Sequence, residues 1–280
     1  MFSQRREATQ AGRFYPADPN QLREAVRRAL AAAERVDLGG AAKGLIAPHA
    51  GYQFSGPTAG WAYKQVEGAP LRRVVVLAPS HYVALDGASI FQGRSYLTPL
   101  GEVVMDEEIV SSLRERKEAV QSVPSADRPE HSLEAQLPFL QVALGEFLLV
   151  PLLVGGVSDE VCAAVADALL DALRRAGARL GEDTLVVASS DLYHGPSAEA
   201  CERSDAELVR EIERFDPVSF QRRSRVREVM ACGAVPIAVM MRLTKDMGAT
   251  ALKVIHRTNS YKVYPVHSDY VVGYLAAAVV

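Results

Sequence analysis

The sequence has few cysteines and no excess of charge of either sign. Only three of its 280 residues are Cys, at positions 162, 201 and 232, and no CxxC pair occurs. This odd, scattered set excludes a disulfide framework and a structural zinc site of the paired-cysteine type. We therefore expect free thiols in a reducing compartment. The formal charge of −3 offers no concentrated basic field, so neither a nucleic acid nor an anionic membrane is expected as a partner.

Long hydrophobic runs are missing as well. The longest, Tyr270–Val280, has 11 residues, short of the roughly 18 to 20 that cross a bilayer. Near the start of the chain, Arg5 and Arg6 are followed by polar residues instead of the apolar stretch of a signal peptide. These absences predict a cytoplasmic protein without a membrane segment.

Several catalytic signatures are absent too. The sequence has no GxSxG nucleophile elbow, no GxGxxG dinucleotide loop after a strand, no GxxxxGK[ST] phosphate loop and no HExxH zinc motif. Serine hydrolysis by the common elbow, dinucleotide-dependent redox chemistry and P-loop phosphoryl transfer are consequently disfavoured.

Apolar runs alternate with segments of helical period along the chain. Short β-branched runs without alternation are typical of strands covered on both faces. Strands and helices in alternation predict an α/β protein, a three-layer αβα sandwich around a mostly parallel central sheet. No linker, compositional break or repeat divides the chain, so residues 1–280 are expected to form a single domain. The four runs are Gly44–Ala47, Val74–Ala78, Phe147–Val154 and Leu185–Ala188.

Start and stop signals mark helices between these runs. Asp18, Asp106 and Ser158 each precede an amphipathic segment as a helix N-cap would, and Gly177 ends the segment after Ser158. The final segment, Asp269–Val280, is rich in Tyr and Val and is predicted to be a further strand.

The densest basic cluster lies late in the chain. Glu228 is close enough in sequence to balance part of its charge. We interpret the cluster as the solvated start of a helix. Its members are Arg222, Arg223, Arg225 and Arg227.

The ends of three predicted strands carry histidines. His49, His81 and His194 follow the runs that begin at Gly44, Val74 and Leu185. In open α/β sheets the carboxyl ends of the strands border the ligand-binding crevice. Three of the six histidines are therefore predicted to converge there. Imidazoles from separate loops suit iron, copper, zinc or nickel.

Two imidazoles need a third ligand, for which the sequence offers Asp191, Glu134 or Cys232. Cys232 lies where Gly233 and Pro236 predict a turn into an apolar helix. A thiol at a helix N-terminus is more acidic, and hence a better ligand or nucleophile, than one buried inside a helix. A role as a small core residue is the alternative for Cys232.

Other polar residues are candidates for the same crevice. His131 and Glu134 precede a predicted helix, for which Ser132 is a natural N-cap. His194, three residues after Asp191, would suit general acid or base work beside a metal-bound substrate. Structural or surface roles are expected for the remaining histidines and cysteines: His256, His267, Cys162 and Cys201.

An ordered series of short motifs runs along nearly the whole chain. The motifs are Ala11–Pro16, Ala47–Tyr52 with Ser55 and Gly56, Pro79–His81, Thr98–Gly101 with Asp106, Glu130–Glu134 with Pro138 and Phe139, Ser189–Asp191 with His194, Ala231–Gly233, and the terminal Val271–Tyr274. Together they resemble the Memo family. So many motifs in one order make the resemblance highly specific.

The resemblance implies a fold similar to class III non-heme-iron extradiol dioxygenases of the LigB type. It assigns the metal-site residues of the family to His49, His81 and Cys232, with Asp191 and His194 in the same pocket. A cysteine stands where those dioxygenases have a carboxylate ligand, which shifts the expected metal from Fe(II) toward copper or zinc. Further candidate pocket residues are His131, Glu134 and Tyr52.

Three functions follow as hypotheses. The first is a metal-dependent redox enzyme of unknown substrate, in which His194 and Asp191 act as acid, base and orienting groups. The alternative is a non-catalytic module that binds a peptide or protein in the same crevice. The third is thiol-based hydrolysis or transfer, with Cys232 as nucleophile and His194 as base. The resemblance also implies partners: eukaryotic members are linked to phosphotyrosine peptides and cell motility, and prokaryotic members to a radical-SAM protein and an AMMECR-type protein.

Overall fold

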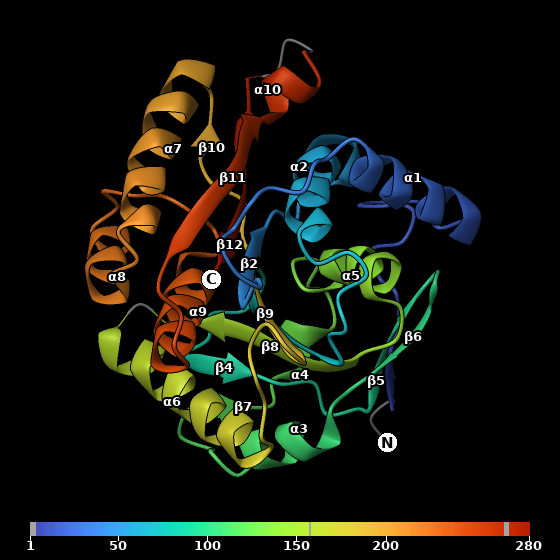
Figure 1. Ribbon diagram of the computed structural model, residues 1–280, viewed down its shortest axis with the longest axis vertical. Helices are drawn as coiled ribbons and strands as arrows, with labels where there is room; N and C mark the ends of the chain where they lie inside the picture. The colour runs from blue at the N-terminus through green and yellow to red at the C-terminus, as the bar shows by residue number, and fades with distance from the viewer. Residues whose placement is uncertain (1–3, 157, 266–268) are drawn as a thin grey trace.

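The computed structural model describes residues 4–156, 158–265 and 269–280, and its centre is a large mixed β-sheet with helices on both faces (Figure 1). The α/β sandwich expected from the sequence is confirmed. Nine strands among the described residues belong to this sheet, in the order β10 (His194–Gly195), β12 (Val271–Val279), β2 (Gly44–Ala47), β9 (Thr184–Ser189), β3 (Arg73–Pro79), β8 (Leu148–Gly155), β4 (Gly87–Ser89) and β7 (Val120–Gln121), with β11 (Leu252–Asn259) also paired to β12.

The four predicted apolar runs form the centre of this sheet. They coincide with β2, β9, β3 and β8 to within one residue at each end, and these strands lie side by side and parallel in that order. Their residues are almost all buried because helices cover both faces. The neighbours β12 and β4 pair antiparallel to this centre. β12 follows β11 after a short connection, which permits antiparallel but not parallel pairing.

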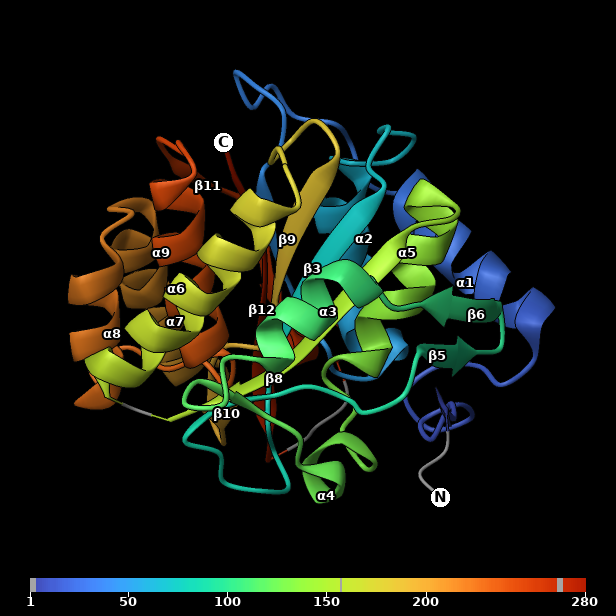
Figure 2. The ribbon, with the colours of Figure 1, turned by 90° about the horizontal axis from the view of Figure 1, so that it is seen from below.

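Two groups of helices enclose the sheet (Figure 2). α2 and α9 pack directly on opposite faces of its parallel centre, and the remaining helices surround these two. One group comprises α1 (Pro19–Ala31), α2 (Tyr52–Lys64) and α5 (Leu137–Leu144). The other comprises α6 (Asp159–Arg175), α7 (Ala198–Glu213), α8 (Pro217–Arg225) and α9 (Ala234–Asp246), with α3 (Glu107–Arg114) beside α6.

The predicted helix starts are confirmed in detail. The side chains of Asp18, Asp106 and Ser158 accept hydrogen bonds from backbone N–H groups in the first turns of α1, α3 and α6. Gly177 follows α6 with a φ of 62°, a left-handed conformation that glycine adopts without strain. Local capping chemistry therefore sets these boundaries.

Shorter elements surround the main sheet. None of them was apparent from hydrophobic periodicity, because elements of two to four residues span at most one helical turn or one strand alternation. They are the small sheet of β1 (Arg5–Arg6), β5 (Ser95–Thr98) and β6 (Gly101–Val104), the helices α4 (Pro124–Asp127) and α10 (Ser260–Val263), and the 3-10 helix η1 (Glu134–Gln136).

The basic cluster lies at the end of α8, so its interpretation as a helix start was wrong. Asp216 caps the start of α8, and Pro217 is its first residue. Arg222, Arg223 and Arg225 occupy the last turn, and Arg227 follows the end of the helix. Arg223 does pair with Glu228, at 2.8 Å. Cationic side chains in the last turn of a helix interact favourably with its macrodipole.

Three further predictions concern single segments. The predicted final strand is confirmed as β12, which is paired along both of its edges. Among the described residues, no helix is both long and apolar enough to cross a bilayer. His256 is half-buried and stacks on Trp61, with ring centroids 5.3 Å apart. His267 lies outside the described residues.

Candidate metal site

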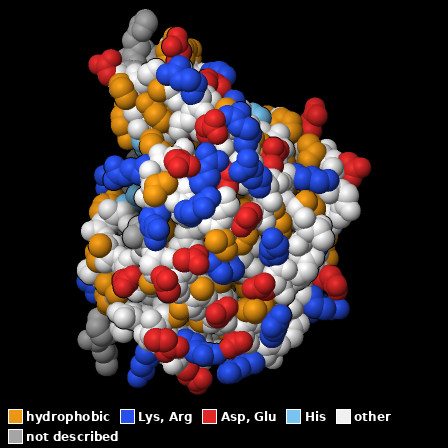
Figure 3. Space-filling model, turned by 90° about the vertical axis from the view of Figure 1, so that its left-hand side faces the viewer, with side chains coloured by type: hydrophobic (Ala, Val, Ile, Leu, Met, Phe, Trp, Pro, Cys, Tyr) orange, Lys and Arg blue, Asp and Glu red, His pale blue; other side chains and the backbone are white. Residues whose placement is uncertain are grey.

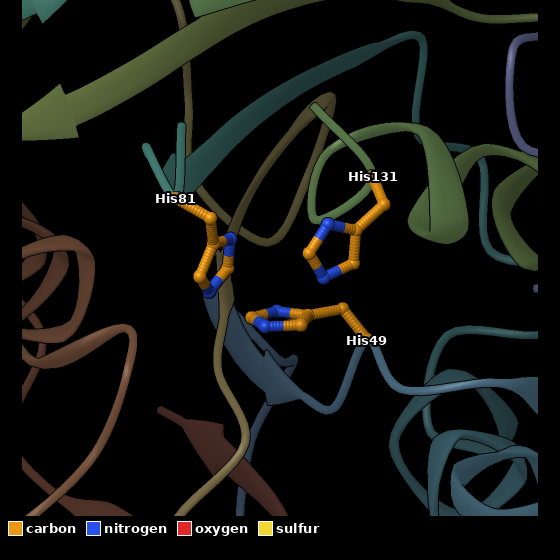
Figure 4. A group of neighbouring side chains, drawn as sticks. All are labelled: His49, His81 and His131. Carbon is orange, nitrogen blue, oxygen red and sulfur yellow. The ribbon is translucent and has the colours of Figure 1, made fainter. Parts of the chain in front are cut away.

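Three histidine rings point toward one another at the carboxyl edge of the parallel strands (Figure 4). His49 follows β2, His81 follows β3, and His131 lies in the loop before η1. One ring nitrogen from each lies within 4.8 Å of the other two. The structure thus brings together His49 and His81, as the strand ends predicted, and adds His131, for which the sequence offered only a candidate pocket position.

The group is open to solvent on one side. His49 is buried, His131 is half-buried and His81 is exposed. The ring of Phe14 packs on His131 with centroids 4.4 Å apart, and the exposed Tyr82 lies edge-on to His131 at 6.2 Å. The group is therefore closed to solvent at His49 and open to solvent at His81.

A hydrogen-bond network fixes the tautomer of His49. Ser189 Oγ has one proton, which it donates to the carbonyl of Ser132 at 2.7 Å. The same oxygen therefore accepts from Gln136 Nε2 at 2.7 Å and from His49 Nδ1 at 2.8 Å. His49 Nδ1 thus carries the proton, and His49 Nε2 keeps its lone pair. Burial, followed by the nearby His81 and His131, holds the pKa of His49 well below its usual range.

Glu130 fixes the tautomer of His81, a role that was not predicted from the sequence. Its carboxylate accepts from His81 Nδ1 at 3.0 Å and from the backbone N–H groups of His81, His131 and Ser132 at 2.7 to 2.9 Å. Burial alone would raise the pKa of Glu130, but these hydrogen bonds outweigh it and hold the pKa at about 2. The position of Glu130 next to His131, within the Glu130–Glu134 motif, was the sequence signal that could have indicated this role.

His131 is the member of the group with unused bonding capacity. Burial lowers its pKa to about 4, so the ring is neutral at pH 7. Its buried Nδ1 lies 3.2 Å from Glu130 Oε1 but in poor geometry, and it has no hydrogen-bond partner among the described residues. Ser132 does not act as the predicted N-cap, because its hydroxyl donates to the carbonyl of Pro79 at 2.8 Å and so ties this loop to the end of β3.

Cys232 lies beside the histidines, immediately before α9. Its Sγ is 3.2 Å from His49 Nε2 and accepts a hydrogen bond from the backbone N–H of Asp191 at 3.2 Å. Burial, and then the charge of Asp191, raises the pKa of the thiol, so the expectation of an acidic thiol was wrong for the metal-free chain. The next residue has to be Gly233, since a Cβ there would lie 2.2 Å from the carbonyl oxygen of Ser189.

Asp191 and His194 occupy different depths of the crevice. Asp191 is buried, and its Oδ1 accepts from the backbone of His49 at 2.9 Å while Oδ2 lies 4.0 Å from His49 Nε2. Burial raises the pKa of Asp191 to about 7. His194 is exposed and pairs with the hydroxyl of Tyr270 at 3.0 Å. Neither belongs to the three-histidine group.

Glu134 and Tyr52, the other candidate pocket residues, lie outside the histidine group and hold neighbouring segments of the chain in place. The structure does not bring Glu134 into the histidine group, because its fully buried carboxylate binds Arg6 at 2.5 Å and also accepts from Thr9, Gln10 and the Tyr15 hydroxyl. Tyr52 donates its hydroxyl proton to the carbonyl of Ala135, at 2.7 Å, and packs on Phe139.

Comparison with known proteins gives one consistent family. The sequence profile of the family described as Memo-like protein matches residues 6–278. A MEMO1 family protein of Thermoplasma volcanium is 32% identical over 270 residues, which cover 96% of each chain. A MEMO1 family protein of Ignicoccus hospitalis is 34% identical over 89% of this chain and 90% of its own. Another, from Methanopyrus kandleri, is 32% identical over 95% of both chains.

Proposed function

The chain belongs to the Memo-like protein family, and from this premise we propose that it binds one transition-metal ion through His49, His81 and His131 and uses it in redox chemistry on a small substrate. The observation that carries the proposal is the convergence of three imidazole nitrogens within 4.8 Å. Cys232, which the family resemblance assigns to the metal site, is proposed as a further ligand because its Sγ lies 3.2 Å from His49 Nε2.

The donor atoms fit a metal ion. The hydrogen bonds of Ser189 and Glu130 direct protons to the Nδ1 atoms of His49 and His81, which leaves both Nε2 lone pairs for a ligand. His131 brings a third ring nitrogen within 4.8 Å of the other two. Imidazole donors suit iron, copper and zinc, and a thiolate from Cys232 would favour copper or zinc.

The chemistry divides between the ion and the chain. Fe(II) or copper would supply electron transfer and polarisation of a bound oxygen atom, and zinc would supply polarisation alone. His194, exposed at the rim, is proposed to exchange protons between substrate and solvent. Asp191 is proposed as the orienting group, because it holds the backbone of His49 in place.

Metal loading tests the proposal. The metal-free chain is incubated without oxygen with Fe(II), copper or zinc in turn, and bound metal is measured by elemental analysis. We expect one ion per chain, lost in His49→Ala and His81→Ala but kept in His256→Gln, a histidine outside the group. X-ray absorption then counts sulfur ligands in the wild type, His131→Ala and Cys232→Ser. No stoichiometric uptake of any of the three metals would refute the proposal.

Turnover and partnership are tested separately. Oxygen uptake by the loaded chain with catecholic compounds checks the redox reaction. An association with a radical-SAM protein and an AMMECR-type protein is also proposed, supported by the family resemblance alone, and co-purification checks it. Binding of a partner that survives loss of both His49 and Cys232 would favour a surface role over a metal role.

A further inference from the structure

Three uncharged polar side chains form a buried hydrogen-bond chain that ends at His49. Charged side chains of both signs are spread over the outer face that carries α7 and α8 (Figure 3), whereas Tyr63, Gln136 and Ser189 are fully buried. They come from α2, from η1 and from the end of β9. Tyr63 is bonded to Gln136, and Gln136 to Ser189. A buried polar network whose members are all paired favours one arrangement of its side chains.

Two backbone carbonyls determine the direction of these hydrogen bonds. The carbonyl of Pro48 can only accept, so Gln136 presents its NH₂ group to it, at 3.0 Å. The same NH₂ group donates its second proton to Ser189 Oγ at 2.7 Å. Gln136 Oε1 then accepts from the Tyr63 hydroxyl at 2.6 Å. The carbonyl of Ser132 takes the hydroxyl proton of Ser189, so Ser189 Oγ has one lone pair left.

Gln136 joins two strand ends that lie on either side of His49. Pro48 follows β2 and immediately precedes His49, and Ser189 is the last residue of the neighbouring strand β9. One amide therefore holds the backbone next to His49 and also the hydroxyl that accepts from His49 Nδ1 at 2.8 Å. The backbone sets where the imidazole ring begins, and the hydroxyl sets how the ring is turned. Both constraints depend on Gln136.

We propose that Gln136 is a positioning residue of the metal site, which holds the His49 ring so that its Nε2 is directed at the ion. The inference rests on the proposed function, in which His49 is a ligand. Gln136 acts through Pro48 and Ser189 and supplies no ligand atom itself. A ligand that is held in its binding orientation before the ion arrives loses less freedom on binding, which raises the affinity for the metal.

Gln141 provides a matched control. It lies in α5, five residues after Gln136. Its Oε1 accepts from the Thr98 hydroxyl at 2.6 Å, and its Nε2 donates to the carbonyl of Gly101 at 3.2 Å. These bonds are of the same kind as those of Gln136, but their partners lie outside the histidine group. Gln141→Met therefore removes equivalent hydrogen bonds without disturbing His49.

Nitrogen NMR of the metal-free full-length chain tests the proposal without reference to the metal. The Nδ1 proton of His49 exchanges with water only when the ring leaves its bond to Ser189. Gln136→Met keeps the length of the side chain but removes both donors, and should accelerate this exchange about three- to tenfold. In Gln141→Met the exchange should stay within about twofold of the wild type, because distant sites act independently.

Metal binding provides the second readout. Zinc affinity, measured by competition with a chelating dye, should fall by about tenfold in Gln136→Met, the lower end of the loss typical for residues that orient a ligand. In Gln141→Met it should stay within about twofold. The absorption spectrum of cobalt(II) bound in place of zinc depends on the arrangement of the ligands. It should shift in Gln136→Met and not in Gln141→Met.

Tyr63→Phe separates positioning from stability. It leaves Gln136 Oε1 without a donor in the core, so the free energy of unfolding in urea should fall, as it should in Gln136→Met. Pro48 and Ser189 keep their donor, however, and zinc affinity should change by less than about threefold. Equal losses of zinc affinity in Tyr63→Phe and Gln136→Met would show that Gln136 acts through stability alone and would overturn the proposal.

A double variant tests whether Gln136 acts through Ser189. The combined loss of zinc affinity in Gln136→Met with Ser189→Ala should be smaller than the product of the two single losses, because both act on His49 Nδ1. Losses that multiply would overturn the proposal, as would an unchanged exchange rate in Gln136→Met. If Gln136→Met does not fold, Gln136→Asn takes its place, because its shorter amide cannot reach both partners. If the wild type takes up no metal, the proposed function fails, and the exchange of the Nδ1 proton alone decides whether Gln136 positions His49.

Discussion

Glu130 and Glu134 are four residues apart in the sequence, and both are buried carboxylates that accept several hydrogen bonds, but they organise two different regions. Glu130 binds His81 through Nδ1 and reaches the backbone of His131. Glu134 binds Arg6, from a strand more than a hundred residues earlier in the chain, and the Tyr15 hydroxyl. We call the first region the histidine group and the second the Glu134 network, which comprises Glu134, Arg6, Thr9, Gln10 and Tyr15.

The two regions differ in how much bonding capacity they leave unused. Both oxygens of Glu134 accept hydrogen bonds, and Arg6 also donates to the carbonyls of Asp127 and Glu130. In the histidine group, His81 keeps its Nε2 lone pair, His49 Nε2 faces the thiol of Cys232 at 3.2 Å, and His131 adds a third ring nitrogen within 4.8 Å. A satisfied cluster holds the chain together, whereas an unsatisfied one is available for a ligand.

The largest expected effect comes from breaking the Glu134 network. Arg6→Ala leaves a buried carboxylate without its cation, so we expect a loss of about 3–5 kcal/mol in the free energy of unfolding, measured by urea denaturation. Glu134→Gln provides a milder version of the same test. Metal uptake by the fraction that remains folded should persist in both variants, because neither residue contacts the three rings.

A neighbouring arginine provides the control for this prediction. Arg5 pairs with Glu102 at 3.5 Å, but both side chains are largely exposed. Arg5→Ala should therefore cost no more than about 1 kcal/mol. If Arg6→Ala costs as little as Arg5→Ala, the Glu134 network does not have the structural role assigned to it.

The second prediction concerns metal affinity. Glu130→Gln replaces one accepting oxygen with an NH₂ group, which cannot accept the proton of His81 Nδ1. Loss of such a partner to a metal-ligating histidine typically costs about 10- to 100-fold in affinity, and we expect this loss for zinc by competition with a chelating dye. Glu134→Gln should leave zinc affinity within a few-fold. Equal losses in the two variants would contradict the division between the regions.

The sequence predicted the parts of the site that depend on the sheet. Strands covered on both faces need uninterrupted apolar runs, so β2 and β3 were visible, and His49 and His81 follow from where those strands end. His131 was harder to place because it lies in a loop whose path depends on Glu130 and on contacts with the N-terminal segment. No periodic pattern carries that information.

Long-range pairing and burial account for the other differences between the predicted site and the observed one. Glu134 is a candidate ligand by sequence, but Arg6 occupies its carboxylate, and a pair separated by 128 positions leaves no local signature. Cys232 does lie at the helix start and beside His49, as expected. Burial nevertheless outweighs the helix dipole and raises the pKa of the thiol. Composition and spacing do not report this balance.

A third prediction concerns Asp127, an incompletely satisfied carboxylate beside the Glu134 network. Its Oδ2 accepts from Ser89 at 3.0 Å, and its buried Oδ1 has no partner among the described residues. Burial raises its pKa to about 6, although Ser89 and Arg6 oppose the shift. The unfolded chain has a pKa of about 3.9 there. The folded state therefore binds the proton more tightly, and the charged carboxylate destabilises the protein above about pH 6.

This linkage has a definite sign. Asp127→Asn should be more stable than the wild type at pH 7.5, by about 3 kcal/mol, and the difference should disappear as the pH falls from about 6 to 4. Urea denaturation of both proteins at several pH values measures it, and other titrating groups cancel in the difference. If the difference does not change with pH, ionisation of Asp127 above pH 6 does not destabilise the folded protein and the prediction is wrong.

The smallest effect is expected from Ser189→Ala, which removes one neutral hydrogen-bond acceptor from His49 Nδ1. The ring stays in place because it is buried, but its proton is no longer held on Nδ1. Zinc affinity should fall by about three- to tenfold, less than in Glu130→Gln, since a neutral hydrogen bond is worth less than one to a carboxylate. Ser55→Ala deletes a buried hydroxyl that donates only to Ala50 and should leave zinc affinity unchanged. Nitrogen NMR of the metal-free chain should show one tautomer of His49 in the wild type and a mixture in Ser189→Ala. A single tautomer in both would mean that Cys232, at 3.2 Å from Nε2, fixes the proton instead.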